Sequence, residues 1–258
     1  MLKSLYRFLV SIGINPKIIR TSLRGRPYFK RDLREIKKQL RDNKDFTITS
    51  LYPILRDRFE TNGRPSHYFY EDLSVAQRIF ENKPVKHVDV GSRVDGFVAH
   101  IATFREIEVF DIRPQPAHVK NITFVTADFM DISPTLHNYA DSLSSLNVIE
   151  HFGLGRYGDP IDVDGHLKGL DNMNKVLKPG GKFYFSTAIG PQRIEFNAHR
   201  AFNVEYLLKI FEPGYRIDRF SYIDDQDNFY QNVTLDPENV KSNFGCHFGF
   251  GIFEMTKK

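Results

Sequence analysis

Residues 87–96 read His-Val-Asp-Val-Gly-Ser-Arg-Val-Asp-Gly, and this stretch decides the fold that we expect. Its first four residues have the pattern of a short strand, and Gly91 follows where that strand should end. A glycine there lets the backbone turn sharply and approach a ligand, because no Cβ stands in the way. Gly96 then precedes a helical pattern over residues 97–104. The stretch therefore predicts the strand, turn and helix that open a doubly wound α/β sheet.

The same alternation of strand and helix continues through the chain. Further strands are predicted at residues 107–110, 122–125, 142–149 and 182–187, a turn at residues 178–181, and helices at residues 71–82, 165–177 and 204–211. Two late strands, at residues 216–223 and 248–255, have no helix between them and predict an antiparallel edge. The expected fold class is α/β: a Rossmann-like, doubly wound, mostly parallel seven-stranded sheet with an antiparallel edge, plus an N-terminal helical extension.

The N-terminal part of the chain differs in charge from the rest. Residues 1–45 hold 13 Lys and Arg against 4 Asp and Glu, whereas the whole chain has a net charge of only +4. The pattern predicts an amphipathic helix at residues 2–12, a loop at residues 24–27 and a charged helix at residues 32–44. We expect a basic, partly helical extension over residues 1–65 and a sheet domain over residues 66–258. Contact of the extension with an anionic partner such as a membrane surface, packing on the domain or a second subunit, and a merely solvated basic face all stay open.

Composition narrows the cellular setting. No apolar run approaches the roughly 20 residues of a membrane-spanning helix. Arg7 interrupts the apolar residues 1–14 and no small-residue cleavage site follows, so we do not expect a signal peptide. The single cysteine, Cys246, excludes an internal disulfide and fits a reducing compartment. We expect a cytoplasmic protein, and leave open a peripheral position at the inner face of the membrane.

Acidic residues follow successive predicted strands. Asp111 ends the second strand, where a carboxylate can accept hydrogen bonds from both hydroxyls of a ribose. Asp128 follows the third strand, where it could accept from an adenine amine while Phe129 packs near the ring. Because carboxyl ends of parallel strands meet at one edge of the sheet, we expect Gly91, Asp111 and Asp128 to converge on one adenosine-shaped cleft.

These motifs together resemble the class I S-adenosylmethionine (SAM)-dependent methyltransferases over residues 86–187. The matching stretches are Val88-Asp89-Val90-Gly91, Val109-Phe110-Asp111, Ala127-Asp128, Ser145-Leu146-Asn147-Val148-Ile149-Glu150-His151 and Leu177-Lys178-Pro179-Gly180-Gly181. The resemblance implies SAM as cofactor, with Tyr68 and Tyr70 expected to line its sulfonium. The residues expected to bind it are Tyr68, Tyr70, Asp89, Gly91, Ser92, Arg93, Asp111, Asp128, Phe129 and Asn147.

The first motif departs from the family pattern. Arg93 and Asp95 stand where the family usually has glycines, so we expect the loop to hold the methionine end of SAM differently. The same departure argues against a dinucleotide oxidoreductase, which needs Gly-x-Gly-x-x-Gly at this turn. Residues 91–97 and 155–160 also resemble a poorly characterised methyltransferase-like family, some of whose members lie among bacterial surface-polysaccharide genes. That resemblance favours a glycan substrate.

Residues 150–166 carry most of the candidate catalytic groups. Methyl transfer to a hydroxyl often requires removal of a proton, and His151 and His166 are the candidate bases. Arg156 could pair with an anionic group of the substrate. The candidate substrate-binding residues are Arg156, Tyr157, Asp159, His199 and Arg200.

Oxygen ligands at Asp159, Asp162 and Asp164, with His166, raise a Mg²⁺ or Ca²⁺ site as an alternative. The same residues can serve as turn and cap residues of the next helix, so we do not favour a metal.

We therefore predict a SAM-dependent methyltransferase, with O-methylation of a sugar or a surface-glycan precursor as the leading function. The sequence pI of about 9.0 leaves an RNA methyltransferase as an alternative. Against nucleic acid, the part of the chain after residue 45 is acidic, and no Asn/Asp-Pro-Pro-Tyr pattern follows the fourth strand. A non-catalytic, methyltransferase-like partner protein also stays open, as does a homo-oligomer.

Overall fold

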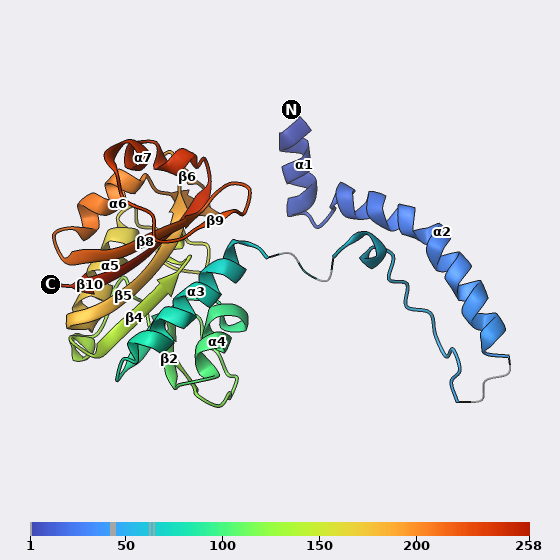
Figure 1. Ribbon diagram of the computed structural model, residues 1–258, viewed down its shortest axis with the longest axis horizontal. Helices are drawn as coiled ribbons and strands as arrows, with labels where there is room; N and C mark the ends of the chain where they lie inside the picture. The colour runs from blue at the N-terminus through green and yellow to red at the C-terminus, as the bar shows by residue number, and fades with distance from the viewer. Residues whose placement is uncertain (1, 42–44, 62, 64) are drawn as a thin grey trace. The chain divides into compact units, whose positions relative to one another are not determined.

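The computed structural model describes residues 2–41, 45–61, 63 and 65–258, and of residues 2–4 and 7 the backbone alone. The chain divides into two compact units, residues 1–64 and 65–258 (Figure 1).

The N-terminal unit consists of two helices followed by an extended segment. Helix α1 spans Leu2–Ser11 and helix α2 spans Pro16–Gln39, and a short 3-10 helix lies at Asp57–Phe59. The side chain of Asn15 caps α2 by accepting hydrogen bonds from the backbone N–H groups of Lys17 and Ile18.

The predicted loop at residues 24–27 is wrong, because α2 continues through it. Proline inside a helix removes one hydrogen bond and costs about 3 kcal/mol, so the helix needs compensation at Pro27. On the side of α2 that carries Gly25, residues 50–58 pack closely and add tertiary contact: a Cβ at Gly25 would lie 1.8 Å from the carbonyl oxygen of Leu55. The predicted helix at residues 32–44 is the second half of α2, and its residues 42–44 lie outside the described residues.

The second unit is built on an eight-stranded sheet in the order β3-β2-β1-β4-β5-β10-β8-β9. Strands β1 to β5 run parallel, and β10 is antiparallel to both of its neighbours. The strands span β1 His87–Val90, β2 Ile107–Asp111, β3 Ile122–Thr126, β4 Ala140–Leu146, β5 Leu177–Ile189, β8 Tyr215–Ile223, β9 Phe229–Tyr230 and β10 Gly249–Lys257. The predicted fold class is confirmed, and the strand beyond the expected seven is the two-residue β9.

Three parts of the sheet unit differ from prediction. The fourth strand, expected at residues 142–149, ends at Leu146, and a 3-10 helix begins at Ile149. The predicted turn at residues 178–181 lies inside β5 as a bulge, because Leu177 pairs with Ala140 whereas Lys182 pairs with Ser142. The hairpin of β6, Arg193–Glu195, and β7, His199–Ala201, is too short to be seen from hydrophobic periodicity.

Helices cover both faces of the sheet (Figure 1). Their bounds are α3 His67–Asn82, α4 Ala99–Ala102, α5 Gly165–Val176, α6 Val204–Phe211 and α7 Pro237–Lys241, with a π-type turn at Val94–Val98 before α4. Val75 and Ile79 of α3 pack with Ile101 of α4 on one face, while α5 and α6 contribute to the larger apolar cluster on the other. This doubly wound arrangement leaves the carboxyl ends of β1 to β4 and their loops free to form a site.

Candidate functional site

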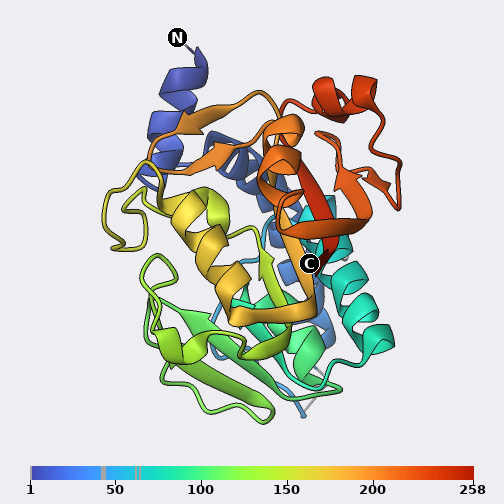
Figure 2. The same ribbon diagram turned by 90° about the vertical axis from the view of Figure 1, so that its left-hand side faces the viewer.

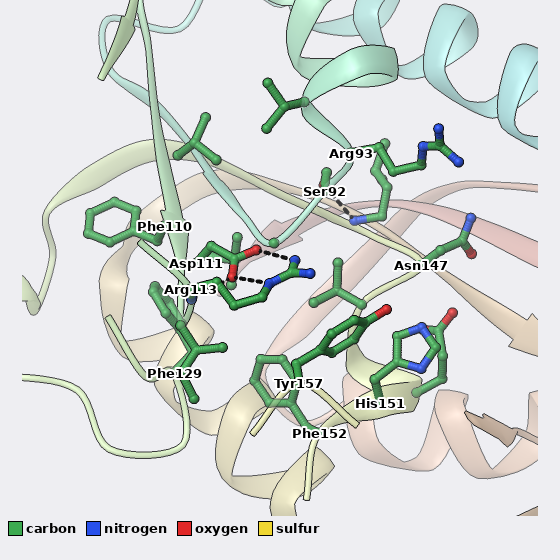
Figure 3. A pocket seen from close by; sticks show the side chains of 18 of the residues that line it. Ser92, Arg93, Phe110, Asp111, Arg113, Phe129, Asn147, His151, Phe152 and Tyr157 are labelled. Atoms are coloured by element: carbon green, nitrogen blue, oxygen red, sulfur yellow. Dashed lines mark hydrogen bonds and ion pairs between the residues drawn. The ribbon is translucent and has the colours of Figure 1, made fainter. Parts of the chain in front are cut away.

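A cavity of about 790 Å³ lies at the carboxyl ends of the parallel strands (Figure 3). Gly91 after β1, Asp111 at the end of β2 and Asp128 after β3 all line it. The three positions expected to share one cleft are therefore brought together. The cavity is also lined by residues after β4, which include Asn147, Glu150 and His151.

The turn after β1 is shaped by Gly91 and Asp89. Gly91 has φ +71°, and a Cβ there would lie 2.7 Å from a methyl carbon of Val148, so no larger residue fits without a shift. Asp89 is fully buried and accepts from the Ser92 backbone N–H (2.9 Å) and from the hydroxyls of Ser92 and Ser144 (2.6 Å each). Burial raises the pKa of Asp89 to about 6. Ser92 lines the cavity but Asp89 does not, so the expected cofactor contact of Asp89 is replaced by a role in holding the turn.

Arg93 and Asp95, which depart from the expected glycine pattern, bind each other at the cavity wall. The Arg93 guanidinium donates to both Asp95 oxygens at 2.8 and 3.1 Å and lies 5.1 Å from the centre of the Tyr68 ring. Tyr68 lines the cavity as expected. Tyr70 is not among the lining residues: it packs 5.5 Å from Phe229, and helix geometry turns it away from Tyr68.

Asp111 is already engaged by a neighbouring cation. Arg113 donates from its backbone N–H and its guanidinium to the Asp111 carboxylate at 2.8–2.9 Å. The same guanidinium lies 4.4 Å from the centre of the Tyr157 ring, so Arg113 sits between Asp111 and Tyr157 (Figure 3). About half of the Arg113 side chain is exposed, which leaves it free to move aside.

The segment after β3 supplies a carboxylate and an aromatic ring. Asp128 accepts from the Met130 backbone N–H at 2.8 Å and lines the cavity. Phe129 is almost fully buried and packs edge-on against Phe110 at 5.6 Å. Both rings line the cavity, so they form an apolar wall beside Asp111 and Asp128.

Asn147 at the end of β4 is held by a buried carboxyl group that the sequence analysis missed. Its side-chain amide donates to Glu71 at 2.6 Å, and Ser186 also donates to Glu71. Glu71 is fully buried, and burial raises its pKa well above the usual range. The sequence could have indicated the burial of Glu71, because Glu71 lies four residues before Val75 and eight before Ile79, on the apolar face of α3.

Glu150 is a second missed carboxyl group, and this one lines the cavity. It is buried and accepts a hydrogen bond from the Thr187 hydroxyl at 3.0 Å. Burial raises the pKa of Glu150 to about 7. The signal for it lay in the fourth-strand motif Ser145–His151, in which Glu150 stands directly before His151.

His151, one of the two predicted bases, also lines the cavity. Its Nδ1 lies 2.7 Å from the Ala198 carbonyl oxygen, which can only accept, so Nδ1 carries the proton and Nε2 keeps its lone pair. Burial and the nearby Arg156 lower the pKa of His151 to about 4. The ring is therefore a neutral acceptor at physiological pH.

His166, the other predicted base, does not line the cavity. It is buried at the start of α5, where its Nε2 lies 2.8 Å from the Tyr206 hydroxyl. Burial lowers its pKa to about 4. This prediction is corrected to a structural contact between α5 and α6.

Residues 153–162 form a closed loop at the cavity wall, beside the β6–β7 hairpin (Figure 2). The Asp162 backbone N–H donates to Gly153 at 3.0 Å and closes the base of the loop. Arg200, expected to bind substrate, is buried instead and donates to the carbonyls of Phe152 and Val163 at 2.5 and 3.2 Å. Arg200 therefore braces the loop from behind.

The predicted substrate residues Arg156, Tyr157, Asp159 and His199 all line the cavity. Arg156 donates to the Ala198 carbonyl at 2.9 Å and makes no ion pair within the part of the chain that the structure describes. Asp159 accepts from two backbone N–H groups of its own loop, those of Gly155 and Tyr157, both at 3.2 Å.

The alternative metal site does not assemble. Asp162 pairs with Lys168, and Asp159 and His166 have the partners given above. Across the described residues, no group of three or more His, Cys, Asp or Glu side chains is placed to hold a metal ion. Asp162 instead accepts from the Asp164 backbone N–H at 2.9 Å, in a turn that precedes α5.

Comparison with known proteins identifies a family and a fold. A model of the family described as "Caenorhabditis protein of unknown function, DUF268" matches residues 98–243, which is more than half of the chain. A search of curated proteins finds no match.

Several solved structures resemble this chain over about three quarters of its length. The cyclase SpnF gives a TM-score of 0.52 at 15% identity, over 77% of this chain and 85% of that chain. A 1,6-didemethyltoxoflavin-N1-methyltransferase from Burkholderia thailandensis, solved with S-adenosylhomocysteine, gives 0.51 at 13% identity, over 72% and 78%. The N-methyltransferase NodS from Bradyrhizobium japonicum WM9 gives 0.50 at 13% identity, over 74% and 96%.

These likenesses show a Rossmann-like methyltransferase fold. One of the three proteins is a cyclase and two are N-methyltransferases. A shared fold does not fix the reaction, so the chemistry must be argued from the cavity itself.

Proposed function

The chain belongs to the DUF268 family, whose function is unknown, and from this premise we propose that it is a SAM-dependent methyltransferase. The observation that carries the proposal is the joint lining of one cavity by Gly91, Asp111 and Asp128. In this fold, ligands bind at the carboxyl ends of the strands. The related fold of the toxoflavin N1-methyltransferase was solved with S-adenosylhomocysteine, the product of methyl donation.

The residues fit an adenosine-containing ligand. Gly91 lines the cavity, and its positive φ and its close contact with Val148 fix the turn after β1 there. Asp111 offers two oxygens for ribose hydroxyls once Arg113 moves aside, and Asp128 stands where it can accept from an amine. Phe110 and Phe129 offer an apolar wall. When bound, SAM would supply an electrophilic methyl group.

On the acceptor side, we propose that Glu150 removes the proton of a hydroxyl group. A carboxylate whose pKa is about 7 is half ionised near neutral pH, which is the condition for an efficient general base. The lone pair on Nε2 of His151 can accept a hydrogen bond from a second hydroxyl of the acceptor and so orient it. These roles favour O-methylation over methylation of an amine that is already nucleophilic.

The polar side of the cavity, which Glu150, His151, His199 and Arg156 line, best suits a sugar or glycan precursor that carries an anionic group. Hydroxyl groups need several polar partners, and Glu150, His151 and His199 provide them. Among the described residues, Arg156 is a lining cation with no carboxylate ion pair, so its guanidinium can bind a phosphate or carboxylate of the acceptor.

Calorimetric titration with SAM and S-adenosylhomocysteine tests the proposal. We expect the wild-type protein to bind both ligands, and Asp111→Asn and Asp128→Asn each to weaken binding at least tenfold, or about 1.4 kcal/mol. Asp162→Asn is the matched control, because Asp162 does not line the cavity and pairs with Lys168. The affinity of this variant for both ligands should equal that of the wild type. A wild-type protein that binds neither ligand would instead support a non-catalytic partner.

The base is tested by transfer of an isotope-labelled methyl group from SAM to a pool of sugar nucleotides and glycan precursors. We expect Glu150→Gln to lose about 100-fold or more in rate, the usual contribution of a general base, with S-adenosylhomocysteine affinity unchanged. In the wild type the rate should rise with pH up to about 7 and then level, because the base must be ionised. Full activity in the Glu150→Gln variant would exclude this role.

A further inference from the structure

The N-terminal unit exposes apolar side chains without a core of its own. Among its described residues, only Gly25 is buried. More than half of the large apolar side chains that the structure describes as exposed lie in this unit, although it holds a quarter of the chain. Those on α1 and the start of α2 include Leu5, Phe8, Ile12, Ile14, Ile18 and Ile19, all 44–59% exposed.

Leu5 and Phe8 share one side of α1 and Ile12 follows just beyond its end, whereas the exposed Val10 lies on another side. Leu5, Phe8 and Ile12 stand three and four positions apart, the spacing of one helix face. Ile18 and Ile19 extend the apolar surface into the first turn of α2. Across the described residues, no helix is long and apolar enough to cross a bilayer, so this surface can lie on a membrane but α1 cannot span one.

The same segment carries positive charge without compensation. Residues 1–31 contain no Asp or Glu, and the first acidic residue of the chain is Asp32. Lys17, Arg20 and Arg26 form no ion pair with any residue that the structure describes. The cations are therefore free to interact with an anionic partner.

The part of α2 from Arg24 onward contacts the extended segment of residues 50–59 within the same unit. Residues 50–58 pack over Gly25, and Arg58 pairs with Asp32 at 2.7 Å. Arg24 lies 4.5 Å from the centre of the Phe59 ring. Within residues 2–23, exposed apolar side chains and cations without an ion pair to a described residue occur together. Further exposed apolar side chains, such as Tyr52, lie on the segment that packs against α2.

We propose that residues 2–23 dock the protein on an anionic lipid surface. An apolar face flanked by cations is the pattern of a helix that lies in the membrane interface. A symmetric contact with the same segment of a second copy would place two uncompensated positive surfaces together, whereas anionic lipid supplies the missing charge. This inference does not depend on the proposed methyl transfer.

Sedimentation of the full chain with lipid vesicles tests the proposal. We expect binding to vesicles that contain phosphatidylglycerol to be roughly tenfold or more stronger than to pure phosphatidylcholine vesicles, and to weaken as salt is added. Leu5→Ser with Phe8→Ser should reduce binding roughly tenfold by removing apolar contact. Lys17→Gln with Arg20→Gln should reduce it by a similar factor by removing charge.

Matched controls keep the total change constant. Lys37→Gln with Arg41→Gln removes the same charge at and just beyond the C-terminal end of α2, and Phe80→Ser with Val85→Ser removes two exposed apolar side chains of the sheet unit, so neither should change binding. Circular dichroism should show unchanged helix content for every variant. Equal binding to both vesicle types, or equal loss in variants and controls, would overturn the proposal. So would a dimer that Leu5→Ser with Phe8→Ser dissociates in the absence of lipid.

Discussion

At the scale of single residues, the contact between Asp111 and Arg113 matters most for ligand binding. Both carboxylate oxygens of Asp111 are engaged by Arg113, so a ribose that needs these oxygens must displace a guanidinium. The pair is partly exposed, and ion pairs of this kind contribute only about 0–1 kcal/mol. A ribose can therefore displace the Arg113 guanidinium at a small cost in free energy, and this cost lowers the affinity for the ligand by a measurable factor.

Replacing Arg113 by glutamine should raise the affinity for S-adenosylhomocysteine by up to about fivefold, because Asp111 no longer has to leave an ion pair. Titration calorimetry measures the change. Arg216→Gln is the control, since Arg216 forms a similar partly exposed pair with Asp218 away from the cavity. Weaker binding by the Arg113 variant would mean that this guanidinium contacts the ligand directly.

The sequence predicted correctly which residues line the cavity where those residues stand at the ends of strands. Asp111 and Asp128 were found because each follows a predicted strand, and backbone topology alone brings such positions together. Asp89 and Arg200 were predicted to bind cofactor and substrate, yet the side chain of each forms hydrogen bonds with backbone groups of the protein. The sequence did not predict this, because packing sets the direction of a side chain at a turn. Glu150 was missed as a site residue because its raised pKa arises from burial, which periodicity does not report.

At the scale of elements, the loop at residues 153–162 depends on glycines of two kinds. Gly153 has φ +73°, and a Cβ there would lie 2.0 Å from the Asp162 carbonyl oxygen. Gly158 has φ +86° with no atom within 4 Å of its Cβ position. Both need the left-handed conformation, but only Gly153 also allows a close approach of two backbones.

Gly158→Ala should therefore lower the free energy of unfolding by about 1–2 kcal/mol, the cost of a left-handed conformation. Gly153→Ala should lower it by about 1–3 kcal/mol more, the added cost of overpacking. Chemical denaturation of the two variants measures the difference. Equal losses would show that the base of the loop opens without strain.

Element prediction succeeded where periodicity was strong and failed where packing overrode it. Helix α6 was predicted with its bounds, and β1 likewise, because their apolar positions are unambiguous. Pro27 suggested a break in α2, yet the helix continues through it, and the segment around Leu55 packs against the neighbouring Gly25. That contact joins residues 30 positions apart, so no local pattern contains it.

At the scale of the whole molecule, buried titratable groups make stability depend on pH in two opposing ways. Burial raises the pKa of Asp72 and Glu150 to about 7 and that of Glu71 well above its usual range. The folded state then binds more protons than the unfolded state above pH 4, so these groups lower stability as pH rises. Burial also lowers the pKa of His87 to about 3 and that of His151 to about 4. The folded state binds fewer protons at these sites below pH 6.5, so they raise stability as pH rises.

The two effects oppose each other between about pH 4 and 6.5, and only the carboxyl groups act above that range. We therefore expect the melting temperature to change little between about pH 5 and 6 and to fall as pH rises above about 6.5. Thermal denaturation at several pH values measures this. In Glu71→Gln, which lacks one of the carboxyl groups, the decline should be shallower. A melting temperature that increases between pH 6.5 and 8.5 would contradict the assignment.

The position of β10 has a consequence for how the protein is made. Residues 249–257 form a strand inside the sheet, between β5 and β8, so β8 and β9 reach the rest of the sheet only through it. During translation, β1 to β5 can assemble as they leave the ribosome, but β8 cannot join them until β10, which follows it in the chain, has been made. A nascent chain stalled before Gly249 would therefore expose the edges of β5 and β8 to chaperones or to other nascent chains.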